Sequence, residues 1–338
     1  MNNPVEQFRN ALADIGVILH PSASIRADGL LHRARSADDK AGALSIWYNF
    51  HADAPCSGVA GNWRTGARLT WCSKRLSALT SAERETLRRR IEQDRAQAQA
   101  ETERRHADAA ARALRMWTVS APANPNHAYL LKKQIQPGIA RQSRGALVLP
   151  VQDFTGQLWG LQSIQPDGSK RFISGMAKQG HFIPAGGHPD GTRPLWIAEG
   201  FATAATIQAM RPNVCTIAAC DAGNLASVAT EARRRFPALD IVVCPDFDKI
   251  GTTKAKDAAI AARAHILPPP TVIPSGCSDW NDWTNHRRGG GVMLNDSEDW
   301  TQDVPPYGDE YEPGTESGPV AAGVIDELPD PLPAACTR

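Results

Sequence analysis

Two short apolar runs, each followed at once by acidic residues and an alanine-rich or lysine-rich helical pattern, constrain this sequence more than any other feature. The first run leads into Glu199 and Gly200, and the second leads into Asp246 and Asp248. Short runs of this kind predict buried parallel strands that feed into helices. Because ligands bind beyond the carboxyl ends of the strands in an open α/β sheet, the three acids indicate a divalent-metal site.

Residues 192–291 repeat this alternation of strand and helix with short links. Strands are expected at 195–198, 214–219 and 241–244, and helices at 201–210, 225–236 and 254–265. Consecutive strand and helix units of this length predict a compact parallel α/β domain with helices flanking the sheet.

The first part of the chain, residues 1–78, predicts a small α+β region. It begins with an amphipathic segment at 5–16 and continues with alternating, strand-like runs at 30–33 and 45–50. A single-strand binding role for Trp63 and Arg64 is one interpretation, because such surfaces combine aromatic and cationic side chains. A tryptophan packed over a hairpin beside an exposed arginine is the alternative.

Residues 79–118 predict one long charged helix. The stretch contains neither glycine nor proline, and Thr80 and Glu83 have the spacing of a capping box. At 1.5 Å per residue such a helix reaches roughly 55 Å, which favours a connecting element or one that packs along one side. Residues 119–191 then predict a lobe that contains a β-meander, with Lys170 and Arg171 on its last strand.

Charge divides the chain into two parts. Residues 1–291 hold 36 basic and 25 acidic side chains, a net charge of +11, whereas residues 292–338 hold 1 and 11, a net charge of −10. A basic body suits a polyanionic partner, although an arginine-rich solvated helix accounts for much of the excess. The acidic segment at 292–338 is poor in apolar residues and predicts a disordered tail.

Cysteine spacing and hydropathy exclude several classes of protein. The seven cysteines include no pair spaced as Cys-x2-Cys, and the single Cys-x4-Cys pair, Cys215 and Cys220, has no second pair to complete four ligands, so no zinc site is expected. No apolar run approaches the roughly 20 residues that cross a bilayer, and the first residues lack a basic region followed by an apolar one. The sequence therefore predicts a cytoplasmic protein with no membrane partner.

Several blocks of the sequence resemble one family. Glu199-Gly200, with Asp246-x-Asp248 and Gly251, resembles the acidic signature of the Toprim domain. Further blocks are more narrowly similar to the Toprim primases of plasmids and phages, including conjugative-transfer primases; they lie at 62–66, 129–133, 168–172, 198–204, 221–225 and 278–282.

This resemblance implies a metal-dependent DNA primase of a plasmid, phage or integrative element. Such an enzyme makes short primers on a single-stranded DNA template from nucleoside triphosphates. Hard cations such as Mg²⁺ or Mn²⁺ prefer carboxylate oxygens, which makes Asp246 and Asp248 the first candidates for metal ligands. The resemblance implies that Glu199 is the general acid or base, or a ligand of the same metal. Asp282, with Asp279 as second candidate, is either a further ligand or a helix cap.

Six residues are candidates for binding nucleotide or DNA, namely Arg64, Lys170, Arg171, Gly200, Asn224 and Lys254. Gly200 would let the backbone approach a phosphate at the start of a helix. Asn224 either orients a nucleotide or template or caps a helix. Lys254 either meets a phosphate or belongs to a solvated helix face.

The sequence contains no P-loop of the form Gly-x4-Gly-Lys-Ser/Thr. We therefore expect a separate replicative helicase as a partner. Two other functions remain compatible with the same acids: a Toprim nuclease, in which water attacks instead of a 3′ hydroxyl, and a non-catalytic accessory protein that binds single-stranded DNA.

Overall fold

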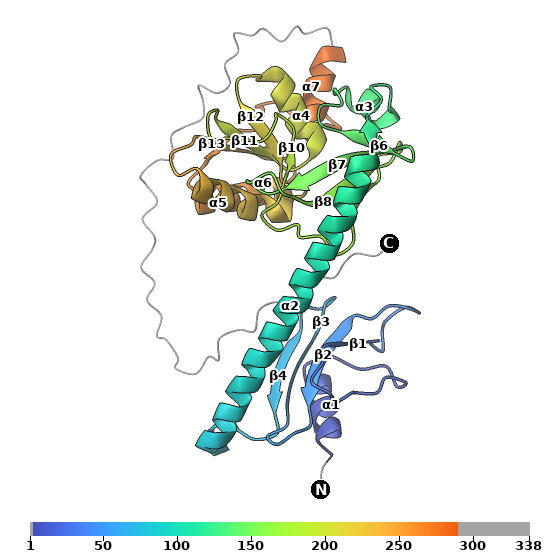
Figure 1. The fold of residues 1–338 in the computed structure, drawn as a ribbon, viewed down its shortest axis with the longest axis vertical. Helices are drawn as coiled ribbons and strands as arrows, with labels where there is room; N and C mark the ends of the chain where they lie inside the picture. Colours follow the sequence, from blue (N-terminus) through green and yellow to red (C-terminus); the bar gives the residue numbers. More distant parts are fainter. Residues whose placement is uncertain (1–2, 290–338) are drawn as a thin grey trace. The chain divides into compact units, whose positions relative to one another are not determined.

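The structure is a computed structural model that describes residues 3–289 (Figure 1). Within this range the chain forms two compact units, residues 3–103 and residues 104–289. The acidic segment predicted to be a disordered tail, residues 292–338, lies outside the described residues. Among the described residues, no helix combines the length and the apolar character that crossing a membrane requires.

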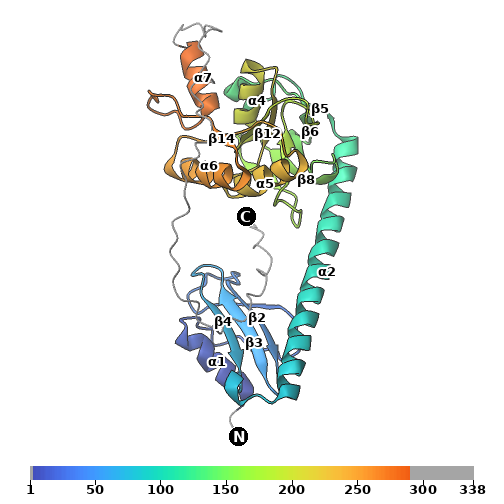
Figure 2. The same ribbon diagram turned by 90° about the vertical axis from the view of Figure 1, so that its left-hand side faces the viewer.

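The first unit is an antiparallel sheet packed against one helix (Figure 2). Helix α1 (Pro4–Asp14) precedes strands β1 (His32–Ala34), β2 (Ile46–His51), β3 (Ser57–Asn62) and β4 (Arg68–Cys72), which pair in sequence order. The amphipathic pattern of α1 places Phe8 and Leu12 in the core, where the Phe8 ring stacks on Phe50 at 4.8 Å between centroids. A single turn of 3-10 helix, Leu76–Ala78, ends this part of the chain.

Helix α2 (Ser81–Val119) confirms the long helix predicted from the sequence. It begins at the predicted capping box: the Glu83 amide donates to the Thr80 hydroxyl, and the Thr80 amide donates to the Glu83 carboxylate. The boundary between the two units falls within this helix. Its first half is bound to the first unit, where His51 Nε2 lies 2.8 Å from the Asp94 carboxylate.

The second half of α2 belongs to the second unit. Ala113 is fully buried against Val148 and Leu161, and Arg112 donates to the backbone carbonyl of Ser174. Polar contacts therefore hold the first half of the helix, and apolar packing holds the second half.

The second unit begins with the predicted β-meander. Its five antiparallel strands follow sequence order: β5 (Ala121–Pro122), β6 (Arg141–Ser143), β7 (Ala146–Gln152), β8 (Leu158–Ile164) and β9 (Lys170–Phe172). The short helix α3 (Ala128–Lys133) lies between β5 and β6 in the chain. Gly168 has a φ of +92° in the turn between β8 and β9, a conformation that favours glycine.

A second sheet follows, and it is parallel except at one edge. Its order is β10 (Ile183–Pro184), β12 (Cys215–Ala218), β11 (Leu195–Ala198), β13 (Ile241–Cys244) and β14 (His265–Ile266), with β10 antiparallel. The helices are α4 (Phe201–Met210), α5 (Leu225–Arg235), α6 (Lys249–Ala262) and α7 (Trp280–Gly289), with the 3-10 turn Ala222–Asn224 before α5. The predicted α/β class with a flanked parallel sheet is confirmed.

Alternating residues of β11 show how the helices divide between the two faces of this sheet. Leu195 and Ile197 pack in one core with α5 and α6, whereas Trp196 and Ala198 pack in the other core with α4 and α7. Successive side chains of a strand point to opposite faces, so the fully apolar sequence of this strand reflects burial on both sides.

Two details differ from the predicted elements. Helix α6 begins at Lys249 rather than Lys254, because the Asp248 side chain caps it by accepting from the Gly251 amide at 2.6 Å. Strands β10 and β14 are only two residues long and were not predicted. Their pairing depends on strands far away in the sequence, which local periodicity does not reveal.

The meander and the parallel sheet share one hydrophobic core. Leu147 and Leu149 of β7 and Leu130 of α3 are buried together with Trp196 and Phe201. The predicted lobe, residues 119–191, and the described part of the predicted domain, residues 192–291, therefore belong to one compact unit.

Candidate active site

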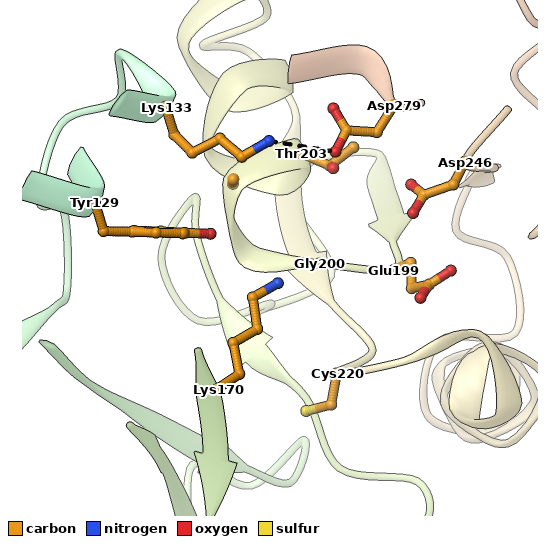
Figure 3. A pocket seen from close by; sticks show the side chains of 10 residues that line it. Tyr129, Lys133, Lys170, Glu199, Gly200, Thr203, Cys220, Asp246 and Asp279 are labelled. Atoms are coloured by element: carbon orange, nitrogen blue, oxygen red, sulfur yellow. Dashed lines mark ion pairs between the residues drawn. The ribbon is translucent and has the colours of Figure 1, made fainter. Parts of the chain in front are cut away.

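The order of the parallel strands brings the predicted acids together. Strands β11 and β13 are neighbours, and Ala198 pairs with Cys244 at their carboxyl ends. Glu199 and Asp246 follow these two positions and thus emerge at the same edge of the sheet (Figure 3). They line a pocket of the second unit with eight other residues: Tyr129, Lys133, Lys170, Gly200, Ala202, Thr203, Cys220 and Asp279.

Asp246 is the most perturbed acid of this pocket. Burial raises its pKa to about 8, and the nearby charges of Glu199, Asp279 and Asp248 act in the same direction. One of its carboxylate oxygens, Oδ1, is buried without a hydrogen-bond partner. The charge of Lys170 acts in the opposite direction but does not reverse the shift. Among the described residues, the fold thus holds Asp246 without a hydrogen bond to Oδ1, which costs folding free energy.

Glu199 has a pKa that is shifted in the same direction. Burial raises the pKa most strongly, and the charges of Asp221 and Asp248 raise it further. A hydrogen bond from the Ala222 amide and the charge of Lys170 act in the opposite direction. A carboxylate whose pKa is raised towards neutrality suits proton transfer as well as metal binding.

Asp248 has a different position from that of Asp246. It is exposed and lies at the N-cap of α6, where its side chain accepts a hydrogen bond from the Gly251 amide. Gly251 lets this turn approach Asp246 closely, since a Cβ on Gly251 would lie 3.1 Å from the Asp246 Cβ. Asp248 contributes negative charge to the site, but it does not line the pocket.

Asp279 and Asp282 lie at the start of α7 and are bound to Lys133 of α3. The Lys133 ammonium lies 2.9 Å from the Asp282 carboxylate and 3.8 Å from that of Asp279. Hydrogen bonds to Lys133 and Ser278 outweigh burial and lower the pKa of Asp282. Asp279 lines the pocket, whereas Asp282 does not. Of the two predicted candidates, the structure thus brings Asp279 to the site and gives Asp282 another partner.

The basic and polar side of the pocket comes from the meander. Lys170 of β9 extends its ammonium to within 3.9 Å of where a Cβ on Gly200 would lie. Arg171, the next residue, is exposed and does not line the pocket. Tyr129 and Lys133 of α3 complete this side, and spacing in the sequence did not identify either as a site residue. They precede Glu199 by more than 60 residues, and only the shared core brings them to it.

The other predicted nucleotide-binding or DNA-binding residues lie elsewhere. The buried Asn224 side chain accepts from the Gly180 amide and donates to the carbonyls of Lys178, His181 and Ala219, so it anchors the 178–181 loop. It does not form a side-chain hydrogen bond that caps α5.

Two cations from the predicted set form ion pairs outside the pocket. Lys254 is exposed on α6 and lies 3.5 Å from the Asp257 carboxylate. Arg64 belongs to the first unit, where its guanidinium lies 3.1 Å from the buried carboxylate of Asp39.

The carboxylates of the pocket meet some of the requirements for binding a hard divalent cation. The buried, unpaired Oδ1 of Asp246 and the neighbouring Glu199 offer carboxylate oxygens, the ligands that Mg²⁺ and Mn²⁺ prefer. Within residues 3–289, however, no three acidic, histidine or cysteine side chains converge closely enough to hold a metal ion. Glu199 and Asp246 are therefore the two residues that would hold it.

Comparison with known proteins finds a family model that matches this domain. Residues 194–289 match the family model of the Toprim domain. The match contains both strand ends that carry Glu199 and Asp246, and it confirms the resemblance seen in the sequence.

Two relatives from Escherichia coli, both named DNA primase TraC, are similar to most of the chain. One is 33% identical over 281 residues, which cover 79% of this chain and 26% of the relative. The other is 33% identical over 283 residues, which cover 79% of this chain and 19% of the relative. The chain thus spans about a quarter or less of the length of these curated relatives.

Among solved structures, the primase fragment of the bacteriophage T7 primase-helicase protein is similar, with a TM-score of 0.40 and 13% sequence identity. The alignment covers 52% of this chain and 72% of that fragment.

Proposed function

We propose that this protein is a metal-dependent DNA primase, which synthesises short primers on single-stranded DNA by nucleotidyl transfer. The observation that carries the proposal is the pair of half-buried carboxylates, Glu199 and Asp246, at the carboxyl ends of neighbouring strands within the residues that match the Toprim domain. The similarity to two proteins named DNA primase over 79% of the chain supports the same reaction.

The proposed roles follow from the chemistry of joining nucleotides. A bound divalent cation supplies Lewis acidity, which activates a 3′ hydroxyl and neutralises charge on the transferred phosphoryl group. Asp246 and Glu199 would hold this cation, with Mg²⁺ or Mn²⁺ as the ion. Glu199, whose pKa is raised, would also take up the proton of the attacking hydroxyl at its carboxylate. Lys170 would contact a substrate phosphate, because its ammonium lies beside Gly200.

The proposed partners are a single-stranded DNA template and nucleoside triphosphates. A replicative helicase that opens the duplex is a further proposed partner. We also propose that Arg64, Arg171 and Lys254 contact the template outside the pocket.

Primer synthesis tests this proposal directly. Full-length protein is incubated with a single-stranded template, labelled nucleotides and Mg²⁺ or Mn²⁺, and the products are separated by length. We expect short primers with the wild-type protein and at least about a 100-fold loss with Glu199→Gln, as is usual when a group that acts on the reacting charge is removed. Glu231→Gln is the matched control, because Glu231 is bound to Arg234 on α5 and should leave activity unchanged.

Two results would contradict the proposal. Full activity of Glu199→Gln would remove this residue from the reaction. Metal-dependent nicking of plasmid DNA in the absence of nucleotides, without any primer synthesis, would show that the same acids serve a nuclease.

A further inference from the structure

The hydroxyl of Tyr129 has no partner inside the protein. Only 3% of this residue is exposed, and its hydroxyl oxygen is buried without a hydrogen bond within the part of the chain that the structure describes. Figure 3 shows this hydroxyl pointing into the pocket, between the ammonium groups of Lys133 and Lys170. Because a buried polar group without a partner destabilises the folded protein, its position points to a ligand.

Hydrogen-bond donors lie around this hydroxyl, together with the carboxylate of Asp279, which is paired with Lys133. Gly200 occupies the N-cap position of α4 and provides no side-chain cap for the first amides of this helix, whose residues Ala202 and Thr203 line the pocket. The ammonium of Lys170 lies beside Gly200. No ion pair of Lys170 occurs among the described residues, whereas Lys133 is bound to Asp279 and Asp282. Lys170 therefore brings positive charge that the protein does not neutralise by direct contact.

Tyr129 also acts as a donor here. Burial, together with the charges of Asp279 and Asp282, raises its pKa to about 12, so the hydroxyl keeps its proton at neutral pH. An ammonium, a phenol hydroxyl and the positive end of a helix favour the same kind of ligand, namely an anion with several acceptor oxygens.

We infer that Tyr129, Lys170 and the first turn of α4 form a phosphate subsite, in which the Tyr129 hydroxyl is a binding residue. The inference rests on the proposed function for the source of the phosphate. That source is either the phosphate chain of a nucleoside triphosphate or a phosphodiester of the nucleic-acid strand. Glu199 and Asp246 lie on the other side of Gly200 and repel a phosphate, so the meander side of the pocket is the one that accepts it.

Tyr129→Phe in the full-length protein tests the subsite, because it removes the hydroxyl and keeps the buried ring. Three quantities are measured: the dissociation constant of ATP with Mg²⁺ by titration calorimetry, the dissociation constant of a labelled single-stranded oligonucleotide, and the melting temperature. We expect about a tenfold loss of affinity for one of the two ligands, as for a hydrogen bond to a charged group. The melting temperature without ligand should stay the same or rise, since an unpaired buried hydroxyl is removed.

Tyr48→Phe is the matched control. Tyr48 is also buried, but its hydroxyl donates to the Ser24 carbonyl and accepts from the Arg26 amide in the first unit. This variant should lose stability and keep the wild-type affinity for both ligands. Loss of stability with unchanged affinities in Tyr129→Phe as well would assign Tyr129 a purely structural role and overturn the subsite.

The two ligands identify the source of the phosphate. A weaker ATP affinity with unchanged oligonucleotide affinity assigns the subsite to the nucleoside triphosphate, and the reverse assigns it to the strand. Wild-type affinities for both ligands in Tyr129→Phe would overturn the inference. Failure of the proposed function is a separate result: the wild-type protein would bind phosphate through Tyr129 and yet make no primers.

Discussion

Two acids of the pocket, Glu199 and Asp246, and Asp282 at the start of α7 have opposite electrostatic environments. Glu199 and Asp246 are half-buried near other carboxylates, and their pKa values are raised. Asp282 is paired with Lys133 and accepts hydrogen bonds from Ser278, and its pKa is lowered. Carboxylates thus have two uses in this unit. A carboxylate that is paired with a lysine stabilises the fold, and one without a paired cation is available to bind a ligand.

The largest expected effect is on activity. Asp246→Asn should reduce metal-dependent primer synthesis by at least about 100-fold, since it removes a proposed metal ligand. Asp282→Asn should reduce it by less than about tenfold, because Asp282 positions Lys133 and does not line the pocket. Initial rates at saturating Mg²⁺ compare the two variants. Equal losses of activity in the two variants would show that pairing with Lys133 does not make Asp282 less important for the reaction than Asp246.

The variants Asp282→Asn and Asp246→Asn should change the free energy of unfolding in opposite directions. Asp282→Asn should destabilise the protein by about 1–3 kcal/mol, because it leaves the half-buried Lys133 without its nearest carboxylate. Asp246→Asn should stabilise the metal-free protein at pH 8 by at least about 1 kcal/mol, since each pKa unit corresponds to about 1.4 kcal/mol. Denaturant unfolding in the presence of a chelator measures both. Destabilisation by Asp246→Asn would mean that its carboxylate has a partner in the fold.

The pH dependence of stability should also separate the two acids. The pKa of Asp246 is about 8 in the folded protein and 3.8 ordinarily. The contribution of Asp246 to the free energy of unfolding is therefore fully present below pH 4, and this stabilisation is lost as the pH rises through 8. For Asp282, the lowered pKa gives a contribution that is present above pH 3.8 and lost at lower pH.

Melting temperatures of the chelated protein between pH 4 and pH 9 test these signs. Asp246→Asn should flatten the decline on the alkaline side, and added Mg²⁺ should oppose the same decline by binding the ionised site. An unchanged alkaline slope in Asp246→Asn would contradict the raised pKa of this group.

The smallest expected effects concern two lysines. Lys170→Met should weaken ATP or oligonucleotide binding about tenfold, whereas Lys254→Met should weaken binding by about twofold or less. Lys170 lines the pocket, whereas the exposed Lys254 is paired with Asp257 outside it, and exposed ion pairs contribute little. Binding measured at low and at moderate salt tests the comparison. A larger loss for Lys254→Met would place the phosphate contact on α6.

Local patterns were sufficient for much of the parallel domain and for the start of α2. The fully apolar run at 195–198, the helical pattern at 201–210 and the capping box at Thr80 all depend on residues within a few positions of one another. The positions of Glu199 and Asp246 at strand ends follow from the same short-range signals, and the order of neighbouring parallel strands then brings them together.

The pocket itself required contacts over long distances in the sequence. Lys133 meets Asp282 across 149 positions, and Tyr129 reaches the site because α3 packs on a core shared by both sheets. No periodicity in a short window encodes such contacts. The same packing determines burial, so it also separates the uncompensated Asp246 from the neutralised Asp282, although both are aspartates that follow a short loop or strand end.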